Sequence, residues 1–185
     1  MTNNAPSARL RLGHSTLAAR DMDVLVAFYT NVLGFQVTNR GAVGEDAELA
    51  FLSQDPEHHH QIAMVRGVPV PDRTLHLVDH LAFRTGTLDD LRRFRAALLE
   101  AGIEGITPIC HGNAWSLYFD DPEGNGIEIY VDSPFHVAQP AAEPFNLDQT
   151  DQEIEQATRE MFADKPEFRP MAEWQEEFAK SLDQS

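Results

Sequence analysis

The sequence repeats itself at an offset of 66 residues, and this duplication constrains the fold more than any other feature. The segment from His14 to Leu25 aligns with the segment from His80 to Leu91. The matched pairs are His14 with His80, Asp23 with Asp89, Leu25 with Leu91, Phe28 with Phe94, and Leu33 with Leu99. A chain that repeats itself in this way is expected to build two copies of one supersecondary unit.

The first copy is predicted to combine one helix with several strands. Residues 10–18 alternate in the manner of a strand with one buried face, and His14 lies with the apolar set. Helical spacing then takes over at 22–33, and Gly34 can end that helix. Further strands are predicted at 47–53 and 60–66.

The second copy repeats this order, beginning with a strand at 78–85 that carries His80. A helix is predicted at 88–100, and Thr87 stands where it can cap the first turn. The turn at 121–126 then joins two strands into an antiparallel hairpin, at 116–120 and 126–132.

The composition changes after Pro134, where an acidic extension begins. Prolines separate two amphipathic segments that are predicted to be helices, at about 150–163 and 171–182. These helices either pack on the core or wrap around a partner subunit, and the sequence leaves both readings open. The expected fold class is α+β: one domain over 8–134, made of βαβββ modules at about 8–67 and 74–132, and a helical extension over 135–185.

Composition and charge exclude several classes of protein. The formal net charge is -16, and residues 133–185 hold 12 acidic against 4 basic side chains, which opposes binding to nucleic acid or anionic membranes. Cys110 is the single cysteine, so no intramolecular disulfide can form. No secretory signal is visible, and no run approaches the roughly 18 apolar residues of a membrane span. We therefore expect a soluble cytoplasmic protein.

Two histidines and one carboxylate occupy related places in the duplication. His14 and His80 align, and the same offset carries Ile62 onto Glu128. Glu128 alternates with apolar residues, so it projects from a strand whose other face is buried, and a desolvated carboxylate needs a compensating charge. A divalent metal can supply that charge, and two histidines with one carboxylate leave positions open for substrate and dioxygen. His14, His80 and Glu128 are therefore predicted metal ligands; the alternative is a glutamate on the solvent face of an edge strand.

Three further residues are candidates for handling protons near such a metal. Counting outward from the turn places Tyr118 opposite Glu128, or one residue away. His60, the last of three consecutive histidines, begins the strand that contains Ile62, and His111 lies just before the Tyr118 strand. Histidine titrates near neutral pH, so it can hold or deliver a proton beside a bound oxygen species. Exposed loop positions are the alternative for both histidines.

These residues together resemble the vicinal oxygen chelate superfamily, and within it the type I extradiol dioxygenases. The resemblance covers about residues 8–134. The run from Tyr118 to Glu128 looks like the family's tyrosine followed ten residues later by its metal-binding glutamate. The Asp-Pro-x-Gly-Asn turn inside that run is common to the whole superfamily. His60 followed by Gln-Ile-Ala63, together with Tyr118, is what selects the dioxygenase branch.

The resemblance implies paired modules that form a cupped sheet around Fe(II), or Mn(II), held by His14, His80 and Glu128. It also implies an oxidoreductase of aromatic compound catabolism, which opens a catechol next to its hydroxyls with O2 and gives a muconic semialdehyde-type product. By the same resemblance, His60 would stabilise the bound oxygen and supply a proton. Tyr118 would hydrogen-bond the bound substrate oxygen, and His111 would contact the substrate hydroxyl.

Two departures from the family pattern concern the ends of the site. The stretch from His111 to Tyr118 is slightly shorter than in larger relatives, and the second, non-catalytic pair of modules is absent. The chain therefore resembles a one-domain form, whose extension would close the pocket or form a homodimer or higher homo-oligomer. Pocket positions are expected at five residues with an apolar bias that suits a mono- or biaryl diol: Thr16, Ala63, Met64, Phe83 and Trp115.

Other members of the superfamily are the main alternatives. A glyoxalase-like enzyme would want a second carboxylate where Ile62 stands. A fosfomycin-modifying transferase must hold a phosphonate, yet the first lysine of the chain is Lys165. A metal-dependent epimerase and a dioxygenase acting on hydroquinones stay open. A non-enzymatic module that binds small molecules would make three aligned ligands a coincidence.

Overall fold

The computed structural model describes residues 12–43, 46–67 and 79–183. Its contacts divide the chain into two compact units, residues 1–72 and 73–185. Each unit holds one copy of the duplicated sequence and has a sheet and a helix of its own. No helix in the described parts of the chain is long and apolar enough to span a bilayer.

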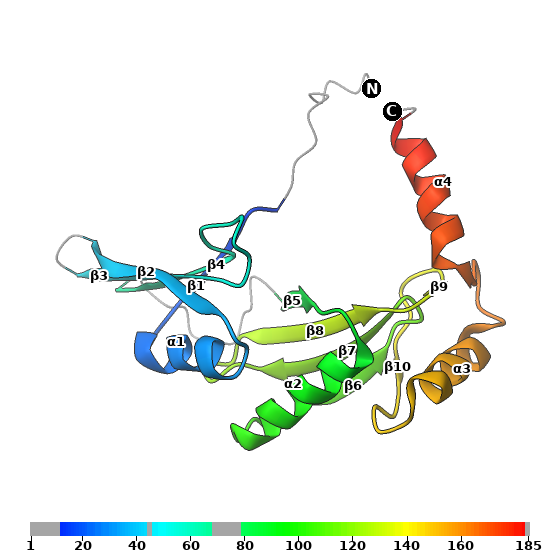
Figure 1. Ribbon diagram of the computed structural model, residues 1–185, viewed down its shortest axis with the longest axis horizontal. Coiled ribbons are helices and arrows are strands. Elements are labelled where there is room, and N and C mark those ends of the chain that lie inside the picture. The colour runs from blue at the N-terminus through cyan, green and yellow to red at the C-terminus, as the bar shows by residue number, and fades with distance from the viewer. Residues whose placement is uncertain (1–11, 44–45, 68–78, 184–185) are drawn as a thin grey trace. The chain divides into compact units, whose positions relative to one another are not determined.

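The first unit is a four-stranded sheet with one helix (Figure 1). Its strands lie in the order β1-β4-β3-β2, with β1 parallel to β4 and the other neighbours antiparallel. The Asp21 carboxylate caps the helix by accepting from two backbone N–H groups of its first turn. The elements are β1 (Ser15–Ala18), α1 (Met22–Asn31), β2 (Gln36–Val43), β3 (Ala47–Ser53) and β4 (Ile62–Arg66).

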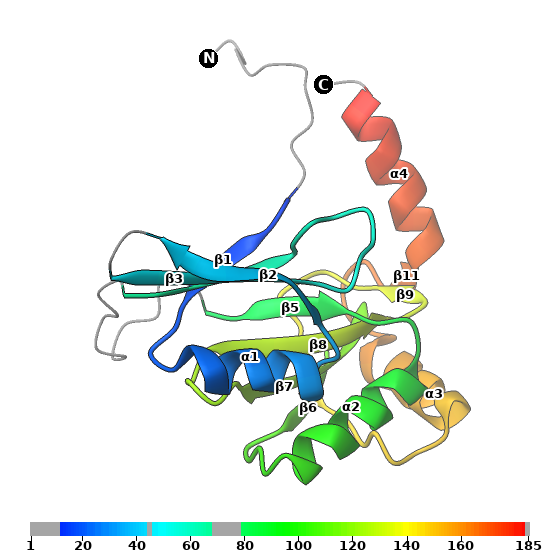
Figure 2. The ribbon, with the colours of Figure 1, turned by 60° about the vertical axis from the view of Figure 1, so that its left-hand side comes forward.

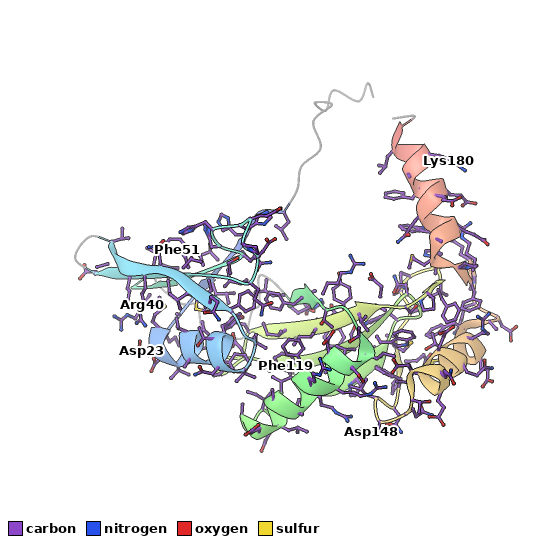
Figure 3. The ribbon with its side chains drawn as sticks, in the orientation of Figure 1. Asp23, Arg40, Phe51, Phe119, Asp148 and Lys180 are labelled. Atoms are coloured by element: carbon purple, nitrogen blue, oxygen red, sulfur yellow. The ribbon has the colours of Figure 1, made fainter. Side chains whose placement is uncertain are left out.

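Strand alternation gives this sheet two different faces. Ile62 and Met64 of β4 lie on one face together with Leu52 of β3, and all three are buried with the apolar side of α1. Phe51 pairs with Ala63 on the other face, away from α1 (Figure 3). The face that carries Phe51 and Ala63 is therefore the one that α1 leaves open.

The second unit is built on a five-stranded sheet in the order β10-β6-β7-β8-β5, with β5 parallel to β8. Thr87 caps α2, as predicted, by accepting from the Asp90 backbone N–H. The elements of this part are β5 (Leu81–Arg84), α2 (Leu88–Glu100), β6 (Thr107–Cys110), β7 (Ala114–Asp120), β8 (Gly126–Asp132), β9 (Phe135–His136) and β10 (Glu143–Pro144).

One face of this second sheet packs on α2. Leu117 and Phe119 of β7 lie on that face beside Ile127 and Ile129 of β8, and all four are buried. Figure 3 shows Phe119 between the sheet and α2. The opposite face carries Glu128, because side chains alternate along β8.

The C-terminal extension contributes α3 (Asp151–Phe162), β11 (Arg169–Pro170) and α4 (Met171–Asp183). α3 packs on the second unit, where the Trp115 indole N–H donates to Thr158 Oγ1 over 2.8 Å. α4 contacts β9 and β11 at its first turn and projects away from them (Figure 2). Packing on the core, one of the two readings of the sequence, is therefore confirmed for α3.

Replacing Thr158 by valine is expected to lower the free energy of unfolding by about 1–3 kcal/mol. Valine keeps the side-chain volume, but the buried Trp115 N–H then loses its acceptor, and an unsatisfied buried donor costs about that much. Urea denaturation should detect the loss. Gln152→Ala, on the exposed side of the same helix, is the control and should leave the midpoint unchanged. An equal midpoint for both variants would contradict the assignment.

Every predicted helix and strand is present within the described residues, and five observed strands were not predicted. The helix at 88–100 and the strands at 47–53 and 126–132 have the predicted bounds. The first residues of the strands predicted at 10–18 and 78–85 lie outside the described residues, and the other predicted elements differ at their ends. The strands without a prediction are β2, β6 and the two-residue strands β9, β10 and β11. Every residue of β2 is exposed, so this edge strand has no apolar alternation. β6 has four residues and contains Pro108, which argues against a strand.

Candidate active site

The parallel pairing of β5 with β8 brings two of the predicted metal ligands together. Ala82 pairs with Glu128, and His80 lies two residues before Ala82, on the same side. His80 Nε2 is 3.1 Å from Glu128 Oε2. The Glu128 side chain is buried, whereas that of His80 is 33% exposed. The pair therefore lies on the face of the sheet that α2 leaves open.

Asp79, which the sequence analysis missed, fixes the chemistry of His80. Its Oδ2 is 2.8 Å from His80 Nδ1, and since a carboxylate only accepts, Nδ1 carries the hydrogen. In the neutral form of the ring, Nε2 then directs its lone pair at Glu128 Oε2, and in the charged form it donates to that oxygen. Two acceptors at 3.1 Å need a shared proton or a cation between them, and a carboxylate–histidine–metal arrangement supplies the cation. An aspartate directly before a candidate ligand histidine was the signal in the sequence.

Replacing Asp79 by asparagine is expected to weaken metal binding about 10-fold. Loss of an outer-shell carboxylate typically costs 10–100-fold in affinity, and the lower end applies because the Asp79 side chain is 97% exposed. A competition titration against a chelator measures the change. Asp120→Asn is the control, because Asp120 lines the same surface pocket as Asp79 and His80 and the change also removes one negative charge. It is expected to leave metal affinity unchanged. Equal affinities for both variants would contradict the role of Asp79.

The first unit carries the other predicted ligand, His14, next to His60. The two rings lie 4.4 Å apart between centroids, and Phe51 contacts His60 edge-on at 5.0 Å. Burial, and then the positive charges of His14 and His59, lower the pKa of His60. His58 instead pairs with Asp55 at 2.8 Å and is exposed. Of the histidine run, His60 is therefore the one that contacts a predicted ligand.

Within the described ranges, no three His, Cys, Asp or Glu side chains converge in the way a metal ion requires. His14 belongs to the first unit, whereas His80 and Glu128 belong to the second. The three-ligand set consequently stays a prediction. His80 and Glu128 have the nitrogen and oxygen atoms that a divalent metal binds, and Asp79 orients His80. This pair therefore fits two of the three predicted ligand positions.

The register of the sheets corrects one correspondence in the duplication. Thr16 pairs with Ala63 in the first unit as Ala82 pairs with Glu128 in the second. The counterpart of Glu128 is therefore Ala63, and Ile62 lies on the opposite, buried face. The offset between the two copies is 66 residues at His14 and His80 but 65 residues at Ala63 and Glu128. An alignment anchored on the two histidines does not detect this change. The methyl side chain of Ala63 now occupies the position where a glyoxalase-like enzyme would need a second carboxylate. The argument against that class of enzyme is therefore unchanged.

Tyr118 lies directly across from Glu128, as the hairpin count allowed. Its hydroxyl is 2.8 Å from Glu128 Oε1 and 2.9 Å from His111 Nε2. Burial, and then the hydrogen bond to the Glu128 carboxylate, raise the pKa of Tyr118 well above its ordinary value. The phenol consequently keeps its proton at neutral pH and acts as a donor.

His111 reaches this group from the loop after β6. Its Nδ1 is 2.6 Å from the Ala141 carbonyl oxygen, so Nδ1 carries a hydrogen and Nε2 of a neutral ring is an acceptor. The single phenolic proton of Tyr118 then has two acceptors within reach, Glu128 Oε1 and His111 Nε2. A proton can therefore move between the carboxylate side and the imidazole side of the hydroxyl.

An open pocket of about 490 Å³ lies over these residues within the second unit. Its volume is in the range of sites that hold small organic ligands. Two of its residues, Gln139 and Met171, come from the C-terminal extension. The lining consists of Ala82, His111, Asn113, Ala114, Tyr118, Glu128, Tyr130, Asp132, Gln139 and Met171.

The structure corrects part of the predicted pocket lining. Met64, Phe83 and Trp115 alternate with Ala63, Ala82 and Ser116, so they lie on the helix-covered faces of their sheets. Thr16 and Ala63, by contrast, share the open face of the first sheet with each other. Strand alternation with Glu128 would have indicated Tyr130. No sequence signal pointed to Gln139 or Met171.

Comparisons with known proteins agree with this architecture. The family profile described as Glyoxalase/Bleomycin resistance protein/Dioxygenase superfamily matches residues 11–129. A curated relative, biphenyl-2,3-diol 1,2-dioxygenase 3 of Rhodococcus globerulus, is 36% identical over 127 residues, which are 66% of this chain and 64% of that protein. Catechol-2,3-dioxygenase of Bacillus subtilis (strain 168) is 33% identical over 129 residues, 66% of this chain and 42% of that protein.

A solved structure shows the same fold. The crystal structure of a glyoxylase/bleomycin resistance protein/dioxygenase domain from Frankia sp. EAN1pec superposes with a TM-score of 0.59 at 24% identity, covering 68% of this chain and 100% of that chain. The profile covers well over half of the sequence. The chain therefore belongs to the glyoxalase/bleomycin resistance protein/dioxygenase superfamily.

Proposed function

We propose that this protein is an extradiol dioxygenase that uses Fe(II) and O2 to open a catechol ring next to its two hydroxyls, giving a muconic semialdehyde-type product. The observation that carries the proposal is the His80–Glu128 pair at 3.1 Å, with the Tyr118 hydroxyl on the other carboxylate oxygen. The names of the curated relatives, both diol dioxygenases, support it. The matched part spans 64% and 42% of their lengths, so their activity is carried over as a proposal.

His80 and Glu128 would hold the metal, with His14 as the third ligand predicted from the duplication. When bound, the metal lowers the pKa of the catechol hydroxyls and brings the diol and O2 together. Glu128 supplies negative charge from a buried position, and Asp79 keeps the lone pair of His80 Nε2 directed at the site. These residues therefore fix the place where the diol binds.

Tyr118 would orient the diol and His111 would exchange its proton. The raised pKa of Tyr118 makes its hydroxyl a donor at neutral pH, suited to a substrate oxygen that has lost its own proton. His111, held by the Ala141 carbonyl, presents Nε2 to the same hydroxyl. Loss and return of the diol protons can then pass through protein groups rather than bulk water. His60 would supply the proton on the oxygen side, as the family resemblance implies.

Incubation with three diols tests the proposal. Protein loaded anaerobically with iron is mixed with catechol, 3-methylcatechol and 2,3-dihydroxybiphenyl in air, and the visible absorbance of a yellow semialdehyde is recorded. Activity with at least one diol, lost after chelation and restored by Fe(II), is the expected result. Absence of product from all three, with one equivalent of iron bound, would sink the catechol assignment.

Two features of the described residues argue against the other metal-dependent activities. Ala63 stands in the place of the second carboxylate that a glyoxalase-like enzyme would want. The pocket over Tyr118 and Glu128 has no lysine or arginine among its described lining residues, whereas a transferase acting on a phosphonate needs positive charge to hold it. A neutral diol that ionises on binding makes no such demand.

A further inference from the structure

The C-terminal extension reaches the face of the sheet that carries Glu128. Gln139 and Met171 line the same pocket as His111, Tyr118 and Glu128. The family profile ends at residue 129, so both residues lie beyond the matched region. The contribution of Gln139 and Met171 to the pocket therefore comes from outside the matched family domain.

Gln139 ties the extension to the loop that carries His111. Its Nε2 donates to the His111 carbonyl over 2.9 Å, and its Oε1 accepts from the Ala141 N–H over 3.0 Å. This places the Ala141 carbonyl 2.6 Å from His111 Nδ1. β10 fixes the next residues by pairing Glu143 with Cys110 of β6. Gln139 thus contacts the His111 backbone directly and helps to hold the Ala141 carbonyl that His111 Nδ1 faces.

Met171 is anchored equally firmly at the start of α4. The two preceding residues pair with β9, and the Met171 N–H donates to the Pro134 carbonyl over 2.8 Å. One turn later, Trp174 stacks on His136 at 4.9 Å, nearly parallel. Because these contacts fix the first turn, the backbone of Met171 has a fixed place at the edge of the pocket, and its half-buried side chain lines it.

The pocket lining combines polar and apolar residues, since Ala82 lies across from Glu128 and Ala114 lies across from Asp132. A hydrogen-bonded chain runs from Glu128 through Tyr118 to His111. Ala82, Ala114 and Met171 supply apolar surface in the same pocket. Methionine is flexible and polarisable and makes favourable contacts with aromatic rings. A second ring attached to a diol would contact this apolar surface, whereas a single-ring diol would leave it uncovered.

We propose that the C-terminal extension completes the substrate pocket: Gln139 positions His111, and Met171 bounds the space that accepts the second ring of a biaryl diol. The proposal rests on the proposed diol chemistry and adds the substrate class that the extension selects. It makes Met171 a specificity-determining residue and Gln139 a positioning residue.

Binding without O2 tests the role of Met171. The affinities of iron-loaded protein for 2,3-dihydroxybiphenyl and catechol are measured anaerobically by calorimetry, and their ratio is compared among variants. Met171→Trp fills the space and is expected to shift the ratio about 10-fold against the biaryl diol, the size of a modest steric clash in an apolar pocket. Met171→Phe, which adds less bulk, is expected to give an intermediate shift. Gln175→Trp, on an exposed position of the same helix, is the control and should keep the wild-type ratio.

Nitrogen-15 spectra of the histidines, together with steady-state kinetics, test Gln139. In metal-free protein, His111 is expected in the Nδ1–H form, and Gln139→Ala is expected to change its signals and lower kcat more than it raises KM. Gln139→Glu, which keeps only the accepting oxygen, is expected to fail to rescue them.

The outcomes separate the two proposals. An unchanged affinity ratio in folded Met171→Trp, or unchanged His111 signals in Gln139→Ala, would overturn the role of that residue. Binding without turnover in the wild-type protein would overturn only the dioxygenase function. Binding of neither diol would overturn both.

Discussion

Replacing Glu128 by glutamine is expected to weaken metal binding more than 100-fold and to abolish activity. Loss of an outer-shell partner alone costs about 10–100-fold in affinity, and Glu128 would contribute the charge itself. The substitution keeps the side-chain volume and leaves an amide oxygen that can accept from Tyr118, so the fold should persist. Removing a buried negative charge also removes the reason for a cation to enter this face of the sheet.

Metal content after loading and dialysis measures the effect, with circular dichroism as the check on folding. Asp132→Asn is the matched control, because Asp132 lies on β8, lines the same pocket and forms an ion pair with Arg84. It is expected to bind one equivalent of iron, as the wild type does. A folded Glu128→Gln protein that retains its iron would remove Glu128 from the ligand set.

The sequence predicted the elements whose burial leaves a periodic trace. The helix at 88–100 and the strand at 126–132 have a buried and an exposed side, and the apolar residues report it. β2 leaves no trace because both of its sides are exposed. Ile62 was matched to Glu128 for a related reason: a constant offset cannot register a one-residue change in loop length, whereas sheet pairing can.

The site was predictable where its residues lie on paired strands. Tyr118 and Glu128 face each other because the length of the turn fixes the register of a hairpin. His80 meets Glu128 through the parallel pairing of β5 with β8; the duplication indicated that the two residues belong to one site but not how their strands pair. Gln139 and Met171 reach the pocket through irregular chain segments, whose path depends on contacts distant in sequence. Periodicity carries no information about such paths.

Replacing Tyr118 by phenylalanine is expected to lower kcat about 100-fold while metal binding is kept. General acid–base groups contribute about 10²–10⁴-fold to rates, and the lower end applies because His111 and Glu128 remain. The change removes one hydroxyl, which leaves Glu128 Oε1 without this donor and His111 Nε2 without this partner. It should affect the proton steps and the orientation of the diol more than its affinity.

Tyr130→Phe provides the matched comparison, because Tyr130 lines the same pocket from β8 and no hydrogen bond ties its hydroxyl to Glu128 in the described contacts. Both variants lose one hydroxyl from one face of one sheet, so a general change in pocket polarity would affect them equally. A kcat loss confined to Tyr118→Phe, with unchanged iron content, therefore assigns the effect to the chain from Glu128 through Tyr118 to His111. Equal losses in both variants would mean that the pocket needs its hydroxyls for polarity alone, and the proposed proton route would be wrong.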